Sequence, residues 1–144
     1  MHRPGQAIPY SWPLRERPLH FELGCMLECA STDLGKVPVR GKRIGWWECD
    51  LTNDRLSWTG GVYDIFGLPR DASITRSETL ALYAEHSRAI LERLRSDAIR
   101  NHCGFTLDAE LRVAGGEERW SRVIGAPDIV GGKVVRLHGL KLWL

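Results

Sequence analysis

Hydrophobic and polar residues alternate along the C-terminal part of the chain. Polar residues separate the apolar positions Phe105, Leu107, Ala109, Leu111 and Val113. Such period-two alternation predicts a strand with one buried and one solvated face. Gly115-Gly116 and Gly131-Gly132 can adopt the positive φ that tight turns need. These turns would join the strand to antiparallel neighbours, one from about Glu117 to Ala126 and one from Lys133 to Leu142.

A second strand-forming region begins at Ile44. An aromatic-rich run over Ile44–Leu51 ends at Thr52-Asn53-Asp54, and a short run over Arg55–Trp58 follows at once. Asn and Asp favour turns because their short side chains hydrogen-bond to the neighbouring backbone. The pattern therefore predicts a β-hairpin.

Helical spacing occupies the segment between these two regions. A short helix over Val62–Phe66 would stop at Gly67. Thr75 and Glu78 have the spacing of a helix-capping box. A longer helix would follow and end at Gly104, and its buried face would carry Ile90, Leu94 and Ala98.

The order of these elements predicts an α+β domain. Two strands come first, several helices follow, and three strands close the chain. All five can form one antiparallel sheet if the helices cross its face between the second and third strand. We therefore expect a five-stranded antiparallel sheet with helices on one face, and a pocket between the two layers.

Residues 1–43 differ from the rest and hold five of the seven prolines. We expect an extended arm followed by an amphipathic helix, in which Pro18 takes the first position and about Ser31 the last. The main domain would then cover residues 44–144. The apolar stripe of the helix needs a partner, either the main domain or a second copy of the helix. Our candidates for a homodimer interface are Leu19, Leu23 and Leu27.

Composition excludes several classes of protein. The chain has 144 residues, of which 43% are hydrophobic and 26% charged, and a net charge of +2. We expect neither a nucleic-acid partner nor a membrane, because the charges nearly balance and no apolar run approaches the roughly 18 residues that span a bilayer. No secretory signal is evident at the N-terminus. We expect reduced thiols in a cytoplasmic protein, and no metal site, from the spacing of Cys25, Cys29, Cys49 and Cys103.

Several short segments occur in an order that resembles a known family. They are Gly45–Leu51, Leu56–Trp58, Ile65–Gly67, Tyr83–Ile90, Glu110–Arg112, Arg119-Trp120 and Val135–Gly139. Their order and spacing are similar to those of the PAS domain, of the type found in bacterial sensor histidine kinases and diguanylate cyclases. This resemblance covers about residues 44–140. It implies a five-stranded antiparallel sheet with helices on one face, and a non-catalytic module that senses a small ligand or another signal and often forms dimers.

The C-terminus departs from the family pattern. PAS domains of this type usually leave the last strand through an Asp-x-Thr motif, whereas this chain has Leu140–Leu144 there. We therefore expect action on a signalling partner in trans. The alternative is an input-domain fragment of a sensor histidine kinase or a diguanylate cyclase, with catalysis confined to an output domain.

A ligand pocket would lie between the long helix and the sheet. The candidate wall residues are Ile90, Leu94, Phe105, Leu107, Trp120 and Ile124. The tryptophans of the strands either build the core or line this cavity. No cofactor is required by the sequence. His86 and His102 have polar neighbours, which favours solvated histidines over haem ligands, and non-covalent flavin binding stays open because its contacts lack a compact motif.

A small enzyme of another α+β family is the remaining alternative. Ser57, Ser121, His86 and His138 would supply its reactive groups. No motif places a nucleophile on a sharp turn beside its base. We therefore expect no catalytic residues.

Overall fold

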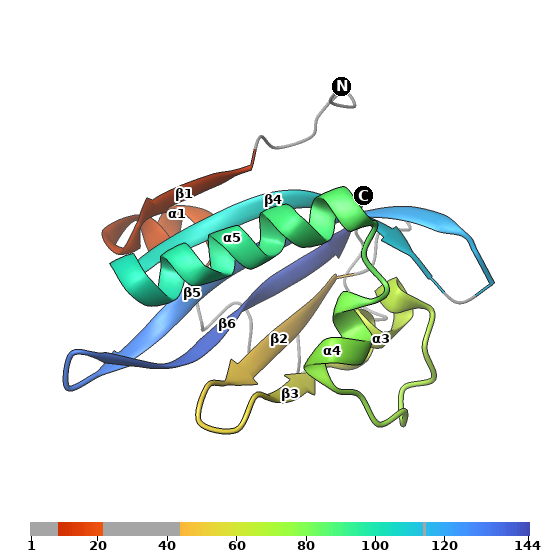
Figure 1. The fold of residues 1–144 in the computed structure, drawn as a ribbon, viewed down its shortest axis with the longest axis horizontal. Coiled ribbons are helices and arrows are strands. Elements are labelled where there is room, and N and C mark those ends of the chain that lie inside the picture. The colour runs from red at the N-terminus through yellow and green to blue at the C-terminus, as the bar shows by residue number, and fades with distance from the viewer. Residues whose placement is uncertain (1–8, 22–43, 114) are drawn as a thin grey trace.

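The computed structural model describes residues 9–21, 44–113 and 115–144. The first elements are β1 (Tyr10–Pro13), the 3-10 helix η1 (Leu14–Glu16) and α1 (Arg17–His20). The hairpin β2 (Ile44–Asp50) and β3 (Arg55–Trp58) precedes three helices, α3 (Gly60–Phe66), α4 (Arg76–Leu80) and α5 (Glu85–Asn101). The last strands are β4 (Cys103–Arg112), β5 (Glu118–Val130) and β6 (Lys133–Trp143), and Figure 1 shows α5 lying across them.

All strands form one antiparallel sheet in the order β1-β4-β5-β6-β2-β3. Strand β6 joins the opening hairpin to the C-terminal strands, because it pairs with β2 on one side and β5 on the other. The predicted antiparallel sheet is confirmed, with one strand more than expected. Tyr10–Pro13 pair with Cys103–Thr106 at the sheet edge, so this part of the expected arm is extended and forms a strand of the sheet.

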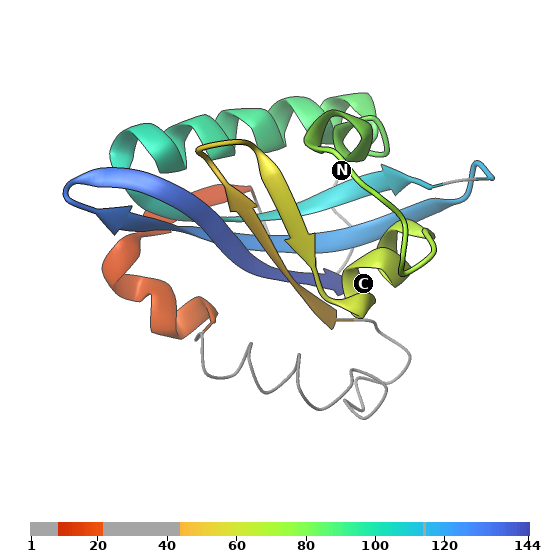
Figure 2. The same cartoon turned by 90° about the horizontal axis from the view of Figure 1, so that it is seen from below.

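The helices between β3 and β4 cover one face of the sheet, as predicted. Figure 2 shows α4 and α5 on one side of the sheet and α1 on the other. The long helix ends at Asn101, three residues before the predicted stop at Gly104, because His102, at φ 55°, forms its left-handed cap and Gly104 already lies in β4. Glycine is needed at position 104 for another reason. A Cβ there would lie 2.2 Å from the Trp12 ring of β1.

The turn and capping signals act as the sequence predicts. Gly115 and Gly116 have φ of 91° and 85°, and Gly131 and Gly132 have φ of 59° and 80°. The Thr75 hydroxyl caps α4, since it accepts a hydrogen bond from the backbone amide three residues on, at 3.2 Å. These local interactions fix where the strands turn and where α4 begins.

Each face of the sheet carries its own hydrophobic cluster. The cluster beneath the helices includes Trp47, Phe66, Phe105, Leu107, Leu111 and Leu137. The cluster on the outer face contains Trp12, Phe21, Ile124 and Ala126. Trp12 is 2% exposed, and its indole N–H donates to Thr106 Oγ1 at 3.0 Å. The segment from Tyr10 to Phe21 therefore covers part of the outer face.

The predicted helix over residues 18–31 begins as α1, but Phe21 has an extended backbone, so no continuous helix runs through it. Leu19 is 81% exposed. Leu23 and Leu27 lie outside the described residues, as do Cys25 and Cys29. The dimer interface and the domain boundary at residue 43 stay predictions. Of the helices described, none is long and apolar enough to cross a membrane.

Candidate ligand-binding cavity

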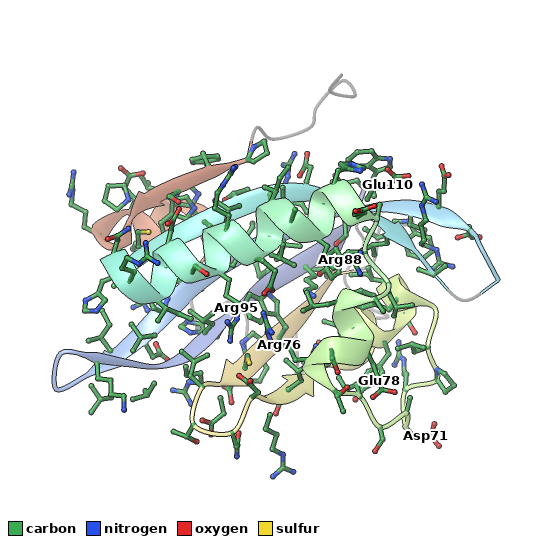
Figure 3. The ribbon with its side chains drawn as sticks, viewed as in Figure 1. Asp71, Arg76, Glu78, Arg88, Arg95 and Glu110 are labelled. Carbon is green, nitrogen blue, oxygen red and sulfur yellow. The ribbon has the colours of Figure 1, made fainter. Side chains whose placement is uncertain are left out.

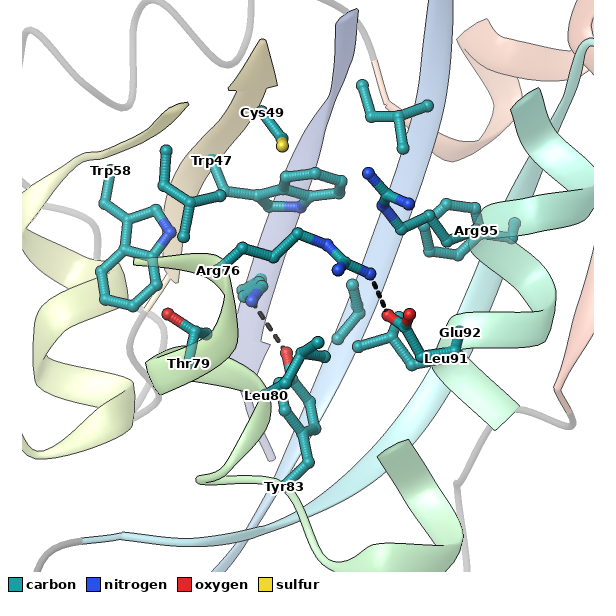
Figure 4. A pocket seen from close by; sticks show the side chains of 15 residues that line it. Trp47, Cys49, Trp58, Arg76, Thr79, Leu80, Tyr83, Leu91, Glu92 and Arg95 are labelled. Atoms are coloured by element: carbon teal, nitrogen blue, oxygen red, sulfur yellow. Dashed lines mark hydrogen bonds and ion pairs between the residues drawn. The ribbon is translucent and has the colours of Figure 1, made fainter. Parts of the chain in front are cut away.

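A cavity opens between the helix layer and the sheet, where β2 and β3 face α4 and α5 (Figure 4). Its volume is about 70 Å³, well below the roughly 300–1,000 Å³ of pockets for drug-sized molecules, so only a small ligand fits without movement of the walls. Most of the lining is apolar or aromatic. It consists of Trp47, Cys49, Leu56, Trp58, Arg76, Thr79, Leu80, Tyr83, Leu91, Glu92, Arg95, Phe105, Val123, Leu137 and Lys141.

Trp47 forms the sheet side of the cavity. Its indole N–H donates to the backbone carbonyls of Ile124, at 3.2 Å, and Leu140, at 3.3 Å. The ring can lie over the sheet because β5 carries Gly125 beneath it. A Cβ at Gly125 would lie 2.8 Å from the Trp47 ring and 2.6 Å from the Phe105 ring, so the absence of a side chain there makes room for both aromatic walls.

A buried lysine stands at the inner end of the cavity. Lys141 is 6% exposed, and its Nζ donates a hydrogen bond to the Tyr83 hydroxyl at 2.8 Å. Four aromatic rings surround this ammonium within the range of cation–π attraction. The distances from Nζ to the ring centres are 4.6 Å for Phe66, 5.4 Å for Tyr83, 5.7 Å for Trp58 and 5.8 Å for Trp47.

Burial changes the protonation of both partners in this hydrogen bond. It lowers the pKa of Lys141 from 10.5 to about 7, because the charged ammonium loses its hydration. It raises the pKa of Tyr83 well above the ordinary value of a phenol. At neutral pH the lysine is therefore divided between its charged and neutral forms, whereas the tyrosine keeps its proton.

Charged side chains frame the mouth of the cavity. Arg76 of α4 forms an ion pair with Glu92 of α5, and an Arg95 nitrogen lies 3.4 Å from an Asp54 carboxylate oxygen. Figure 3 shows Arg76 and Arg95 in the gap between α4 and α5, and in Figure 4 both side chains extend towards the middle of the pocket. The Arg76 and Arg95 side chains are 24% and 22% exposed. The mouth is thus more open to solvent than the inner end at Lys141.

Three of the predicted wall residues pack between α5 and the sheet without lining the cavity. Leu94 and Leu107 are buried members of the inner cluster, and Ile90 packs against it. Phe105 does line the cavity. These positions are consistent with a pocket between long helix and sheet, but their contact with a ligand stays a prediction.

The other two predicted wall residues come from β5. Ile124 belongs to the outer cluster, on the face away from the helices. Its neighbour Val123 lines the cavity instead, because successive side chains of a strand point to opposite faces. Trp120 lies four residues before Ile124 on β5, so its side chain points to the same outer face. It is half-buried and does not line the cavity. The assignment of Ile124 and Trp120 to this pocket is therefore wrong.

Lys141 is missing from the predicted wall residues, although the sequence carries a signal for it. Lys141 lies four residues after Leu137 on β6, so both side chains point to the same face of the sheet, towards the helices. A lysine at such an inward position, between Leu140 and Leu142, marks a buried charge. No comparable signal exists for the ion pair across the mouth, whose two residues come from separate helices and meet only in the fold.

The candidate haem and catalytic residues lie away from this cavity. Neither His86 nor His102 lines it, and the His86 side chain is 62% exposed. In the sheet register Glu48 stands between Ser57 and His138, so this serine and imidazole are not direct neighbours. Within the described residues, no group of three or more His, Cys, Asp or Glu side chains is placed to hold a metal ion.

Comparison with solved structures identifies the class of fold. An RNA-binding light-oxygen-voltage receptor matches with a TM-score of 0.64 and 16% identity, over 71% of this chain and 29% of the receptor chain. The N-terminal domain of a diguanylate cyclase with a PAS/PAC sensor, from Marinobacter aquaeolei, matches with a TM-score of 0.62 and 11% identity, over 69% of this chain and 93% of that one. A sensory box histidine kinase/response regulator from Burkholderia thailandensis has a TM-score of 0.61 and 15% identity, over 70% and 76%.

These likenesses show a PAS-like fold, as the sequence resemblance implies. No protein-family model matches the chain, and no curated protein matches it. The chain spans less than a third of the light-oxygen-voltage receptor.

Proposed function

We propose that the chain is a non-catalytic sensory module of bacterial signalling that binds a small ligand in the cavity beneath α4 and α5. The observation that carries this proposal is the cavity itself, whose aromatic and aliphatic walls end at a buried lysine. A concave, mostly apolar site with a few placed polar groups is the usual form of a small-molecule pocket. The sensor proteins among the structural neighbours support the same role.

The signal would reach a cytoplasmic partner in trans, or an output domain of kinase or cyclase type in the same chain.

Filling the cavity tests the proposal. Leu56 lines the cavity from the outermost strand β3 and is half-buried, so Leu56→Trp places a larger ring in the ligand's space with little disturbance of the central sheet. Native mass spectrometry and a thermal-shift screen of small metabolites would identify ligands of the wild-type protein. We expect Leu56→Trp to lose them, whereas Val130→Trp, at a site that is 65% exposed, should keep them. Binding that survives in both variants would show that the cavity is not the site.

We also propose that the protein forms a homodimer through Leu19, Leu23 and Leu27. Leu19 is 81% exposed on α1 while Phe21 beside it is 6% exposed, so this short segment presents one apolar side chain away from the sheet. Replacing Leu19, Leu23 and Leu27 together by Gln should convert a dimer into a monomer in light scattering. The full chain is required, because Tyr10–Pro13 form part of the sheet. Equal masses for wild type and variant would exclude this interface.

A further inference from the structure

Among the described residues, one charge in the cavity has no counter-ion. At the mouth, Arg76 pairs with Glu92 and Arg95 with Asp54. Lys141, at the inner end, has the Tyr83 hydroxyl as its hydrogen-bond partner, and the described residues place no carboxylate within ion-pair distance of it. An ammonium carries three N–H donors, so this one contact leaves most of its capacity unused.

The polar pair at the inner end is arranged to receive an anion. Because the Tyr83 oxygen accepts a hydrogen bond from Lys141 Nζ, its own hydroxyl proton is available to a second acceptor. A carboxylate oxygen placed beside both groups would accept from Nζ and from the phenol at once. Charge-assisted hydrogen bonds of this kind are stronger than neutral ones, and they offset the cost of burying a charge.

The walls define the rest of the ligand. Trp47 and Trp58 present aromatic surface, while Leu56 and Leu91 present aliphatic surface. A ligand body in contact with these residues gains free energy by leaving water only if it is apolar. A cationic ligand is disfavoured, because the single carboxylate of the lining, Glu92, is already paired with Arg76.

We propose that the cavity takes a carboxylic acid with a flat or unbranched apolar body, whose carboxylate lies against the Lys141 ammonium and the Tyr83 hydroxyl. This inference rests on the proposed ligand-binding function and specifies its chemistry. The body would lie between the Trp47 and Trp58 walls, and Arg76 and Arg95 would stand over its outer end.

Binding of such an acid is coupled to a proton. The titratable or charged groups that share the cavity with Lys141 are Cys49 on β2, Arg76 on α4, Tyr83 before α5, and Glu92 and Arg95 on α5, whereas β4 and β5 contribute uncharged walls. The pKa of Lys141 is about 7 in the protein alone, and a bound carboxylate raises it. Above that pH the affinity for the acid should therefore fall about tenfold per pH unit, until the pKa of the bound state is reached. The affinity for a neutral analogue should stay constant.

Matched acids and amides test the inference by isothermal titration calorimetry on the full chain. The probes are phenylacetate and hexanoate, each against its primary amide, phenylacetamide and hexanamide. At pH 6.5 we expect the wild-type protein to bind each acid at least tenfold more tightly than its amide. At pH 8, titration in two buffers of different ionisation enthalpy should show the uptake of about one proton with the acid and none with the amide.

Two lysine variants complete the experiment. Lys141→Met should abolish the preference for the acid and keep the weak binding of the amide. Lys133→Met, at an exposed position on the same strand, should behave as the wild type. Acids that bind no better than amides, that bind equally well to Lys141→Met, or that do not bind the wild type at millimolar concentration would overturn the carboxylate proposal and leave the cavity open to neutral ligands. Acid binding that survives in Leu56→Trp would instead overturn the cavity as the site.

Discussion

Replacing Lys141 by methionine should make the empty protein more stable at neutral and acidic pH. The lysine is 6% exposed and carries a charge into an apolar cluster. Methionine has a similar length and no charge, and its flexible thioether adapts to irregular spaces. A buried charge without a counter-ion costs free energy, which the substitution would recover.

The magnitude follows from the pKa of Lys141 in the two states. The pKa is 10.5, the ordinary value of a lysine, in the unfolded chain and about 7 in the folded protein. Between pH 7 and pH 10.5 the unfolded chain binds more protons than the folded protein, so the free energy of unfolding rises with pH. A pKa shift of this size means that the charged lysine lowers the free energy of unfolding by about 5 kcal/mol. The Tyr83 hydroxyl loses its partner in the variant, which costs about 1–3 kcal/mol. Below pH 7 we therefore expect Lys141→Met to gain about 2–4 kcal/mol.

Urea unfolding followed by tryptophan fluorescence measures both the gain and the pH dependence. From pH 7 to pH 8.5 the stability of the wild type should rise by about 1.5 kcal/mol relative to Lys141→Met, because the folded lysine is half protonated at the start of this range. Lys133→Met should follow the wild type. The range stops there because burial also raises the thiol pKa values of Cys49 and Cys103, and these groups lower stability at higher pH. A variant less stable than the wild type at pH 6, with a parallel pH profile, would show that the buried charge stabilises the fold and would refute this reasoning.

Three further substitutions test the features that build the fold and the cavity wall. Thr75→Ala removes the cap of α4 and should cost about 1 kcal/mol in urea unfolding, while Thr75→Ser should cost little; equal losses would show that the hydroxyl does not act as a cap. Gly125→Ala places a methyl group 2.6 Å from a Phe105 ring atom. It should cost about 1–3 kcal/mol and shift the tryptophan emission, and an unchanged spectrum would contradict the close packing. Trp12→Ala removes a side chain that is 2% exposed and should cost about 3–5 kcal/mol. Tyr10→Ala, 41% exposed on the same strand, serves as its control, and a similar small loss for both would mean that β1 contributes little.

The elements that local patterns control are the ones that the sequence predicts. The glycine pairs fix the turns after β4 and β5 because they supply positive φ within a few residues of each strand end. The long helix follows from the spacing of Leu94 and Ala98. In these cases the element is determined by interactions between residues close in the chain, so a short stretch of sequence is enough to predict it.

The errors arise where distant segments decide the outcome. On β5, Val123 and Ile124 are both buried, one on each face. When both faces of a strand are covered, apolar residues do not alternate with polar ones along it. The sequence then does not show which residue points inward. The second cover comes from the segment around Trp12, whose pairing with β4 joins residues more than ninety positions apart. Nothing within either stretch indicates this pairing.

The buried lysine differs from the other residues of the inner cluster because packing alone gives no reason for it. The inward face of β6 carries Leu137, then Gly139, then Lys141. Gly139 is required by backbone approach, since a Cβ there would lie 1.8 Å from the Ile124 carbonyl oxygen, and Leu137 fills the core. An apolar residue at 141 would pack equally well without the cost of desolvating an ammonium. Residues that lower stability in this way are expected where a protein binds or reacts. A carboxylate at the inner end of the cavity would supply the missing counter-ion and turn that cost into binding free energy.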